Sequence, residues 1–99
     1  MPTIFEYLGI FIRFYSDDHE PIHIHALYQD AVVKVSFYIK NGVISKITYS
    51  AVKGEFSTSK MKDLKDFIEI YKYQIILKWN EFYAWNKKIK KQSITKKVK

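Results

Sequence analysis

The side chains best suited to chemistry are gathered in one short stretch, residues 15–30, which reads YSDDHEPIHIHALYQD. It holds all three histidines of the chain and four of its ten acidic residues. Imidazoles bind transition metals or transfer protons near neutral pH, and carboxylates add oxygen ligands. The stretch is therefore the candidate centre for a metal site or for acid–base catalysis.

A metal site is the first interpretation of this stretch. His23 and His25 are two residues apart, so on a strand they point to the same face about 6.5 to 7 Å apart and could bind one ion. His19 lies across a turn that Pro21 stiffens and could supply a third nitrogen, while an acidic residue such as Asp17 could supply an oxygen. This ligand set predicts a divalent metal as a candidate cofactor, with one coordination position open for catalysis.

The same three histidines could also act without a metal. One imidazole that titrates near neutral pH would serve as general acid or base, as in ribonuclease-like chemistry, with Arg13 or a lysine holding the phosphate. A third interpretation is structural: His23 and His25 are hydrogen-bonded on a half-buried strand face, and the acidic turn is solvated. The residues alone leave all three interpretations open.

Strands must position these histidines, because apolar residues alternate over most of the first half of the chain. In residues 22–28 the alternation places both histidines on one face and Ile22, Ile24 and Ala26 on the other. A hairpin turn is predicted at 41–42, because Asn and Gly tolerate positive φ angles. The expected strands are residues 9–16, 22–28, 31–39 and 43–52.

The apolar period changes to helical spacing after Gly54. The residues at 57–59 can cap a helix, and apolar side chains then recur every three or four positions. One long helix is expected from about residue 59 to about residue 89, which at 1.5 Å per residue is about 45 Å. Strands of about 17 to 20 Å would leave its second half protruding, so we expect it to contact a second copy or another protein. The alternative is a shorter helix that packs entirely on its own sheet.

The expected fold is α+β, an antiparallel meander of about four strands with one long C-terminal helix packed on one face. The length of 99 residues suits one domain, which we place at residues 1–86, followed by a basic tail at 87–99 that is a frayed helix or disordered. No apolar run approaches the roughly 20 residues of a membrane span, so we expect a cytoplasmic protein with no membrane partner. Because cysteine is absent, disulfides and thiolate zinc sites are excluded.

The net charge of +7 is confined to the tail. Basic and acidic residues are equal in number over residues 1–86, so residues 87–99 carry the whole excess. Such a lysine run can contact nucleic-acid phosphates without sequence preference, or it can simply be solvated. The candidate nucleic-acid residues are Lys87, Lys88, Lys90, Lys91, Lys96, Lys97 and Lys99.

Three segments of the chain resemble a known family. MPTI at the start, GIFIRFYSDDHEPIHIHALYQD after it and ILKWNE in the expected helix are similar to family 4160 of small bacterial domains of unknown function. The three histidines of that family's H-x-P-P-H-x-H segment fall on His19, His23 and His25, and its first proline on Pro21. Ile22 stands where the second proline is usual.

The resemblance implies a biological context and no particular reaction. Members of the family have no assigned activity and are similar to components of small two-gene operons that are suspected toxin–antitoxin modules. We therefore predict a toxin–antitoxin-like protein that binds a protein partner through the helix and nucleic acid through the lysine tail. The alternative prediction is a histidine- or metal-dependent enzyme, such as a nuclease, centred on His19, His23 and His25.

Overall fold

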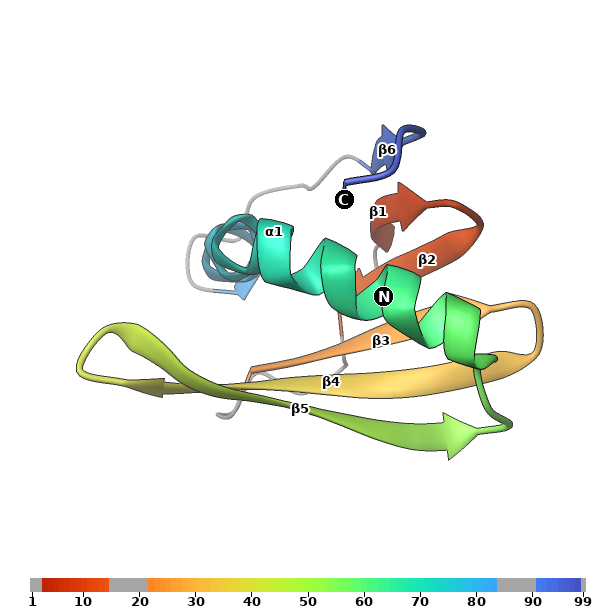
Figure 1. The fold of residues 1–99 in the computed structure, drawn as a ribbon. Coiled ribbons are helices and arrows are strands. Elements are labelled where there is room, and N and C mark those ends of the chain that lie inside the picture. The colour runs from red at the N-terminus through yellow and green to blue at the C-terminus, as the bar shows by residue number, and fades with distance from the viewer. Residues whose placement is uncertain (1–2, 15–21, 84–90, 99) are drawn as a thin grey trace.

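The computed structural model describes residues 3–14, 22–83 and 91–98, which form six strands and one helix. The elements are β1 (Thr3–Tyr7), β2 (Ile10–Phe14), β3 (Ile22–Tyr28), β4 (Ala31–Lys40), β5 (Val43–Lys53), α1 (Thr58–Tyr83) and β6 (Gln92–Ile94). The strands make one sheet in the order β5-β4-β3-β2-β1-β6, and α1 packs on one of its faces (Figure 1). The chain is thus an α+β protein with one helix on a sheet, as the sequence predicts.

The first five strands form a meander in which each strand is antiparallel to the next. A two-residue turn at Leu8 and Gly9 joins β1 to β2, and another at Asn41 and Gly42 joins β4 to β5. All four turn residues have positive φ, which is the backbone requirement of a type I′ hairpin. The predicted hairpin at 41–42 is therefore confirmed.

The sheet has six strands where the sequence predicts about four, because two strands lack the alternating pattern. In β1 the register shifts between Thr3 and Phe5, so the adjacent side chains of Ile4 and Phe5 are both fully buried. β6 has only three residues, two of them exposed, and pairs parallel with β1. Neither strand shows the period of two that identifies a half-buried strand in sequence.

β6 also alters the expected arrangement of the basic tail. The sequence predicts a frayed helix or disorder over 87–99, whereas part of this segment pairs with β1. The Val98 backbone N–H donates a hydrogen bond to the Tyr7 hydroxyl at 3.1 Å, and Lys91 Nζ lies 2.9 Å from Glu6 Oε1. The tail differs from the prediction because the edge of β1 and a carboxylate of the body hold its described part.

α1 begins at the predicted cap. The Ser57 Oγ accepts a hydrogen bond from the Lys60 backbone N–H at 3.1 Å, which satisfies one of the N–H groups that the first turn leaves without a helical acceptor. The helix has 26 described residues and extends to Tyr83, whereas the sequence predicts a helix to about residue 89. Residues 84–90 lie outside the residues that the structure describes. No helix in the described part of the chain is long and apolar enough to cross a membrane.

The hydrophobic core lies between α1 and the sheet, and aromatic rings fill much of it. Phe67 of α1 is fully buried, and its ring centroid lies 5.4 Å from that of Phe5 and 4.9 Å from that of Tyr7. The ring of Tyr71, one helical turn later, stacks on Phe67 at 4.5 Å. Ring pairs of this kind stabilise a core beyond the area that they bury.

The second half of α1 is docked on this core, contrary to the prediction that it protrudes. Ile75 is fully buried, and the rings of Phe82 and Tyr83 lie 5.3 and 5.8 Å from that of Phe14 in β2. The prediction failed because β4 and β5 have 10 and 11 residues. At about 3.4 Å per residue such strands extend about 34 to 37 Å, roughly twice the expected length.

Candidate functional site

The two faces of the sheet differ in chemistry. α1 packs on one face, toward which the buried apolar side chains of the strands point. The opposite face, which no described helix covers and which is here called the open sheet face, carries the residues that alternate with those core positions. Its residues in β2 to β5 are Phe11, Arg13, His23, His25, Leu27, Val32, Lys34, Ser36, Tyr38, Lys40, Val43, Lys46, Thr48, Ser50 and Lys53.

A row of polar and charged side chains crosses four strands of the open sheet face. The register pairs Arg13 of β2 with His25 of β3, and His25 in turn with Lys34 of β4. Lys34 pairs with Ser50 of β5. Directly opposed residues in antiparallel strands have Cβ atoms about 4.5 to 5.5 Å apart. His25 therefore lies between two cationic side chains, and we call these four residues the cationic row.

A second row, of one imidazole and two hydroxyl groups, lies two residues further along these strands. His23 is opposite Ser36, and Ser36 is opposite Thr48. The His23 Nδ1 lies 2.8 Å from the Ser36 Oγ, a hydrogen bond whose direction depends on the imidazole tautomer. Because Ser36 is only 4 % exposed, this bond fixes the imidazole of His23 against the sheet beside the cationic row.

The surroundings of His25 lower its pKa from the ordinary value of 6.5. Burial is the largest cause, and the charges of Lys34, Arg13 and His23 follow in that order. At pH 7 the imidazole is therefore neutral and has a nitrogen that can accept a proton. The row combines this neutral base with two cationic side chains, which favour an anionic ligand.

Exposed aromatic rings flank the cationic row. Phe11 on β2 is 39 % exposed and Tyr38 on β4 is 38 % exposed. A lysine lies over each ring, with Lys46 Nζ 4.8 Å from the Tyr38 centroid and Lys91 Nζ 5.8 Å from the Phe11 centroid. The described part of the tail thus reaches the open sheet face. Aromatic planes beside cations are what unpaired nucleic-acid bases stack on.

The structure describes two of the four predicted metal ligands. His23 and His25 share one face of β3, as the alternation predicts. His19 and Asp17 lie outside the described residues, so the site with three histidines stays a prediction. Within the residues that the structure describes, no group of three or more His, Asp or Glu side chains is arranged to hold a metal ion.

The predicted nucleic-acid lysines are partly described. Lys91 and Lys97 lie 2.9 and 3.9 Å from carboxylate oxygens of Glu6 and Asp63, so their charges are partly compensated, and Lys96 is exposed. The remaining four, which lie outside the described residues, are Lys87, Lys88, Lys90 and Lys99.

Lys34 is a candidate site residue that the sequence analysis did not select, although a signal for it exists. The two-residue turn at 29–30 sets the register of β3 against β4, and counting back from it places Lys34 opposite His25. Arg13 has no such signal, because the longer segment 15–21 separates β2 from β3.

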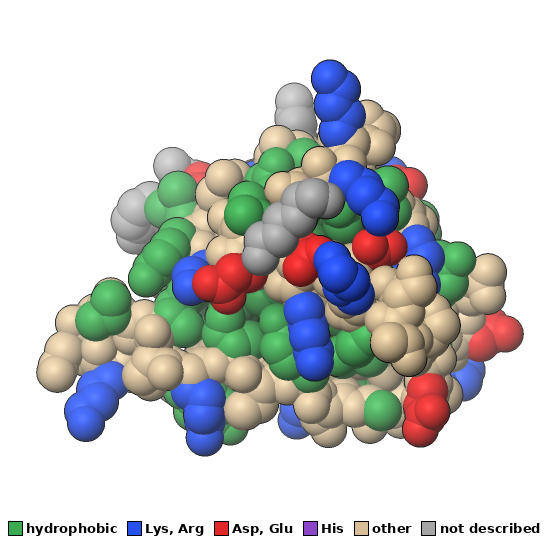
Figure 2. All heavy atoms as spheres, viewed as in Figure 1, with side chains coloured by type: hydrophobic (Ala, Val, Ile, Leu, Met, Phe, Trp, Pro, Cys, Tyr) green, Lys and Arg blue, Asp and Glu red, His purple; other side chains and the backbone are tan. Residues whose placement is uncertain are grey.

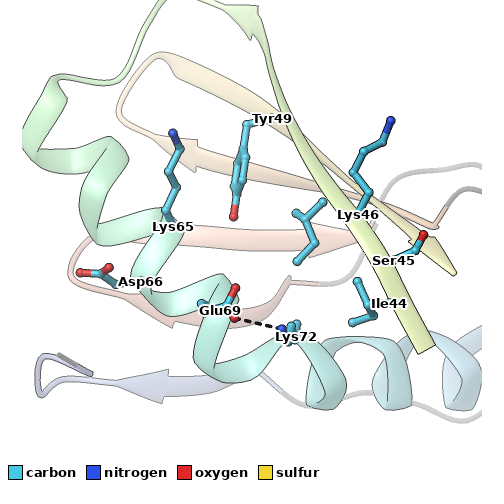
Figure 3. A pocket seen from close by; sticks show the side chains of 9 residues that line it. Ile44, Ser45, Lys46, Tyr49, Lys65, Asp66, Glu69 and Lys72 are labelled. Atoms are coloured by element: carbon cyan, nitrogen blue, oxygen red, sulfur yellow. Dashed lines mark hydrogen bonds and ion pairs between the residues drawn. The ribbon is translucent and has the colours of Figure 1, made fainter.

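A second concave region lies on the helix side of the sheet, between β5 and α1 (Figure 3). This β5–α1 cleft has a volume of about 650 Å³, and Figure 2 shows hydrophobic side chains between its charged ones. Lys65 Nζ lies 5.4 Å from the ring centroid of Tyr49. Burial and then the charge of Glu69 raise the pKa of Tyr49 to about 12. The lining residues are Ile44, Ser45, Lys46, Ile47, Tyr49, Lys65, Asp66, Glu69 and Lys72.

Comparison with known families gives a match over most of the chain. A family model described as Domain of unknown function (DUF4160) matches residues 9–80. The matched segment contains the cationic row and the β5–α1 cleft. No curated protein and no solved structure gives a significant match.

Proposed function

The chain belongs to the DUF4160 family, whose description names no activity, and we propose that its open sheet face binds single-stranded nucleic acid. In this proposal the protein is a cytoplasmic component of a toxin–antitoxin-like pair, a context that comes from the family resemblance. The cationic row is the observation that carries the proposal.

The cationic row supports phosphate binding by its charge and its donors. Arg13 and Lys34 flank His25 on neighbouring strands, and Ser50 adds a hydroxyl at the end of the row. Guanidinium and ammonium groups donate charge-assisted hydrogen bonds to phosphate oxygens, and the neutral imidazole adds no repulsion toward an anion. Contacts of this kind bind the nucleic-acid backbone without reading its sequence.

The aromatic side chains favour a single strand over a duplex. Phe11 and Tyr38 are exposed on the same face as the cationic row. Bases of a single strand can splay onto such rings, whereas bases of a duplex are stacked on one another and are not free to do so. A sheet face with cations between aromatic rings therefore fits single-stranded RNA or DNA.

Fluorescence anisotropy with a labelled single-stranded RNA of about ten nucleotides tests the proposal. Lys34→Gln should weaken binding, because it removes a cation from the row and keeps most of the side-chain length. Lys65→Gln makes the same change on the helix side of the sheet and should leave the affinity unchanged. If the two variants lose affinity equally, or if neither does, the open sheet face is not the binding surface.

For the protein partner we propose the outward stripe of α1. Ile70, Tyr73 and Leu77 are 50, 54 and 53 % exposed, and their spacing of three and four residues places them on one side of the helix. Apolar anchors at this spacing are how an amphipathic helix recognises a groove. The stripe lies apart from the open sheet face, so both ligands could bind together.

Co-purification with the product of the neighbouring gene tests this stripe. Leu77→Glu should abolish co-purification, because it places a carboxylate in the middle of an apolar contact. Ser59→Glu adds the same charge to an exposed position of the same helix, about three turns before Ile70, and serves as the control. If the two proteins still co-purify after Leu77→Glu, the partner binds to another surface.

Cleavage of the bound strand is the second candidate function, favoured by the place of His25 in the cationic row. A neutral His25 could take the proton from a ribose 2′-hydroxyl, whose oxygen would attack the adjacent phosphorus. The bond to the 5′-oxygen would break, and a protonated imidazole, such as that of His23, would return a proton to the leaving oxygen. Arg13 and Lys34 would stabilise the negative charge on phosphorus oxygens.

The metal-dependent form of this candidate uses His23 and His25 together with the predicted ligands His19 and Asp17. Cleavage of labelled RNA with and without a chelator separates the two forms, since chelation stops the metal-dependent one. In the metal-free form, a 2′-deoxy sugar at the cleaved position should block the reaction, and His25→Gln should slow it by about 10² to 10⁴-fold. If the RNA stays intact under all of these conditions, the cleavage candidate is refuted and only the proposed binding is retained.

A further inference from the structure

β5 forms a long edge of the sheet. Among the described strands it lies at one end of the sheet and has 11 residues, whereas β6 at the other end has three. One side of an edge strand presents backbone N–H and C=O groups that no neighbouring strand binds, and proteins usually keep such edges short. β5 contains no proline or glycine and is rich in Val, Ile, Thr and Tyr, which favour strand pairing. This edge is therefore suited to adding another strand.

Two bulges limit the part of β5 that could accept a strand. The register with β4 shifts twice, which leaves Ser45 and Val52 as the extra residues. The Ser45 hydroxyl donates a hydrogen bond to the Tyr38 carbonyl oxygen at 3.1 Å and so fixes the first bulge. Bulges interrupt continued pairing at an edge. An added strand would therefore pair with residues 46–51, which run without interruption between the two bulges.

The side chains of this run alternate between the β5–α1 cleft and the open sheet face. Ile47 and Tyr49 line the cleft and are only partly buried. Lys46 projects from the other side of β5 in Figure 3, and the register places Thr48 and Ser50 on that side too. The cleft borders the edge strand, so a strand added there would cover it.

We propose that the added strand is β5 of a second copy of this chain, antiparallel to the first across a twofold axis at Thr48. Directly opposed residues of antiparallel strands share a face. The axis therefore has to lie midway between the two copies of one residue, so that this residue faces its own counterpart. In this register Thr48 faces its own counterpart, and Ile47 faces the partner's Tyr49. Lys46 faces the partner's Ser50. The two sheets then continue as one, with both helices on the same side.

The run is self-complementary in this register, which is why the occupant is a second copy. The pairing of Ile47 with the partner's Tyr49 joins a β-branched and an aromatic side chain, a favourable combination across strands. Two threonines also pair favourably, and each lysine faces a serine, so no like charges are opposed. The same contact is made twice across the axis, as a closed dimer requires. It places the two β5–α1 clefts beside each other and reduces the remaining exposure of Ile47 and Tyr49.

Sedimentation velocity of the full chain from about 1 µM to about 1 mM measures the dimer, and charge changes at two positions test the register. Ser50→Glu places a carboxylate opposite the partner's Lys46 at two symmetric sites, so Kd should fall by about 2- to 30-fold. The double variant Lys46→Glu with Ser50→Glu opposes two carboxylates and should raise Kd by a similar factor. Lys46→Glu alone faces serine and should leave Kd within about twofold. Gln74→Glu, the same charge change on α1, is the control.

The outcomes are distinct. A wild-type chain that stays monomeric at about 1 mM overturns the proposal. So does a dimer that Leu77→Glu abolishes while the β5 variants leave it unchanged, because that dimer would form through the helix. Hydrogen exchange gives a readout without substitutions: backbone amides within residues 46–51 should gain protection as the protein concentration rises. Protection that does not change while the dimer forms would also overturn it.

Discussion

Replacing two cations of the open sheet face should flatten the salt dependence of RNA binding by an amount that the structure sets. Four of the cationic side chains of this face lie in the cationic row or over the flanking rings: Arg13 and Lys34 in the row, and Lys46 and Lys91 over the rings. Each phosphate that a cation neutralises on a single strand contributes about 0.7 to the slope of log affinity against log salt. If these four cations alone each contact one phosphate, the slope is about −2.8.

The double variant Arg13→Gln with Lys34→Gln leaves two of these cations and a slope of about −1.4. Raising the salt concentration from about 50 to about 200 mM should then weaken wild-type binding by about 50-fold and binding of the variant by about 7-fold. The difference is large enough to measure at three or four salt concentrations.

Fluorescence anisotropy with the same labelled RNA provides the two slopes. The matched control is Lys62→Gln with Lys65→Gln, which removes two positive charges from α1 and lowers the net charge of the chain equally. Its slope should equal that of the wild type. A wild-type slope retained by the variant of the cationic row, or a control that flattens as much, would refute the assignment of phosphate contacts to this row.

Three further predictions concern ionisation and packing. His25 should titrate below pH 6.5 by NMR. As the pH falls, the unfolded chain then takes up the proton before the folded chain does, so the free energy of unfolding of the wild type should decrease between about pH 6.5 and the lower pKa of the folded state. His25→Gln should remove this decrease. The pKa of Tyr49 is raised from 10.0 to about 12. Because the phenol ionises first in the unfolded chain, the free energy of unfolding measured by urea titration should fall as pH rises through that window. Tyr49→Phe should flatten this part of the pH profile, whereas Tyr73→Phe, which changes an exposed ring, should not. Phe67→Ala should lower the free energy of unfolding by about 3 to 5 kcal/mol, against less than about 1 kcal/mol for the half-exposed Ile70→Ala in the same urea titration.

The strands that the sequence predicts are those with an uninterrupted pattern. In β3 and β4 every second side chain is apolar and most of these side chains are buried, so the period of two is visible without the fold. β1 escapes prediction because its bulge puts Ile4 and Phe5 side by side in the core, and β6 because three mostly exposed residues carry no pattern. The helix start at Ser57 is predictable from its capping hydroxyl.

The candidate site divides in the same way. Two imidazoles on one face follow from the spacing of His23 and His25 alone. The position of Arg13 beside His25 does not follow from spacing, because residues 15–21 separate β2 from β3, lie outside the described residues and do not set the register. The lysine tail was predicted as the nucleic-acid site by its charge, yet the cations that the structure brings beside the histidines come mainly from β2, β4 and β5.

Local sequence therefore decides which side chains of a strand share a face, because successive side chains point to opposite sides of the backbone. It also decides the register wherever a two-residue turn joins two strands, as at 29–30. Only the tertiary structure decides that Arg13 pairs beside His25, that β6 lies against β1 from the far end of the chain, and that β5 is left at an edge. Hydrogen bonds between strands join backbone groups that are nearly the same in every residue, so the residue types of two distant strands do not reveal that these strands pair.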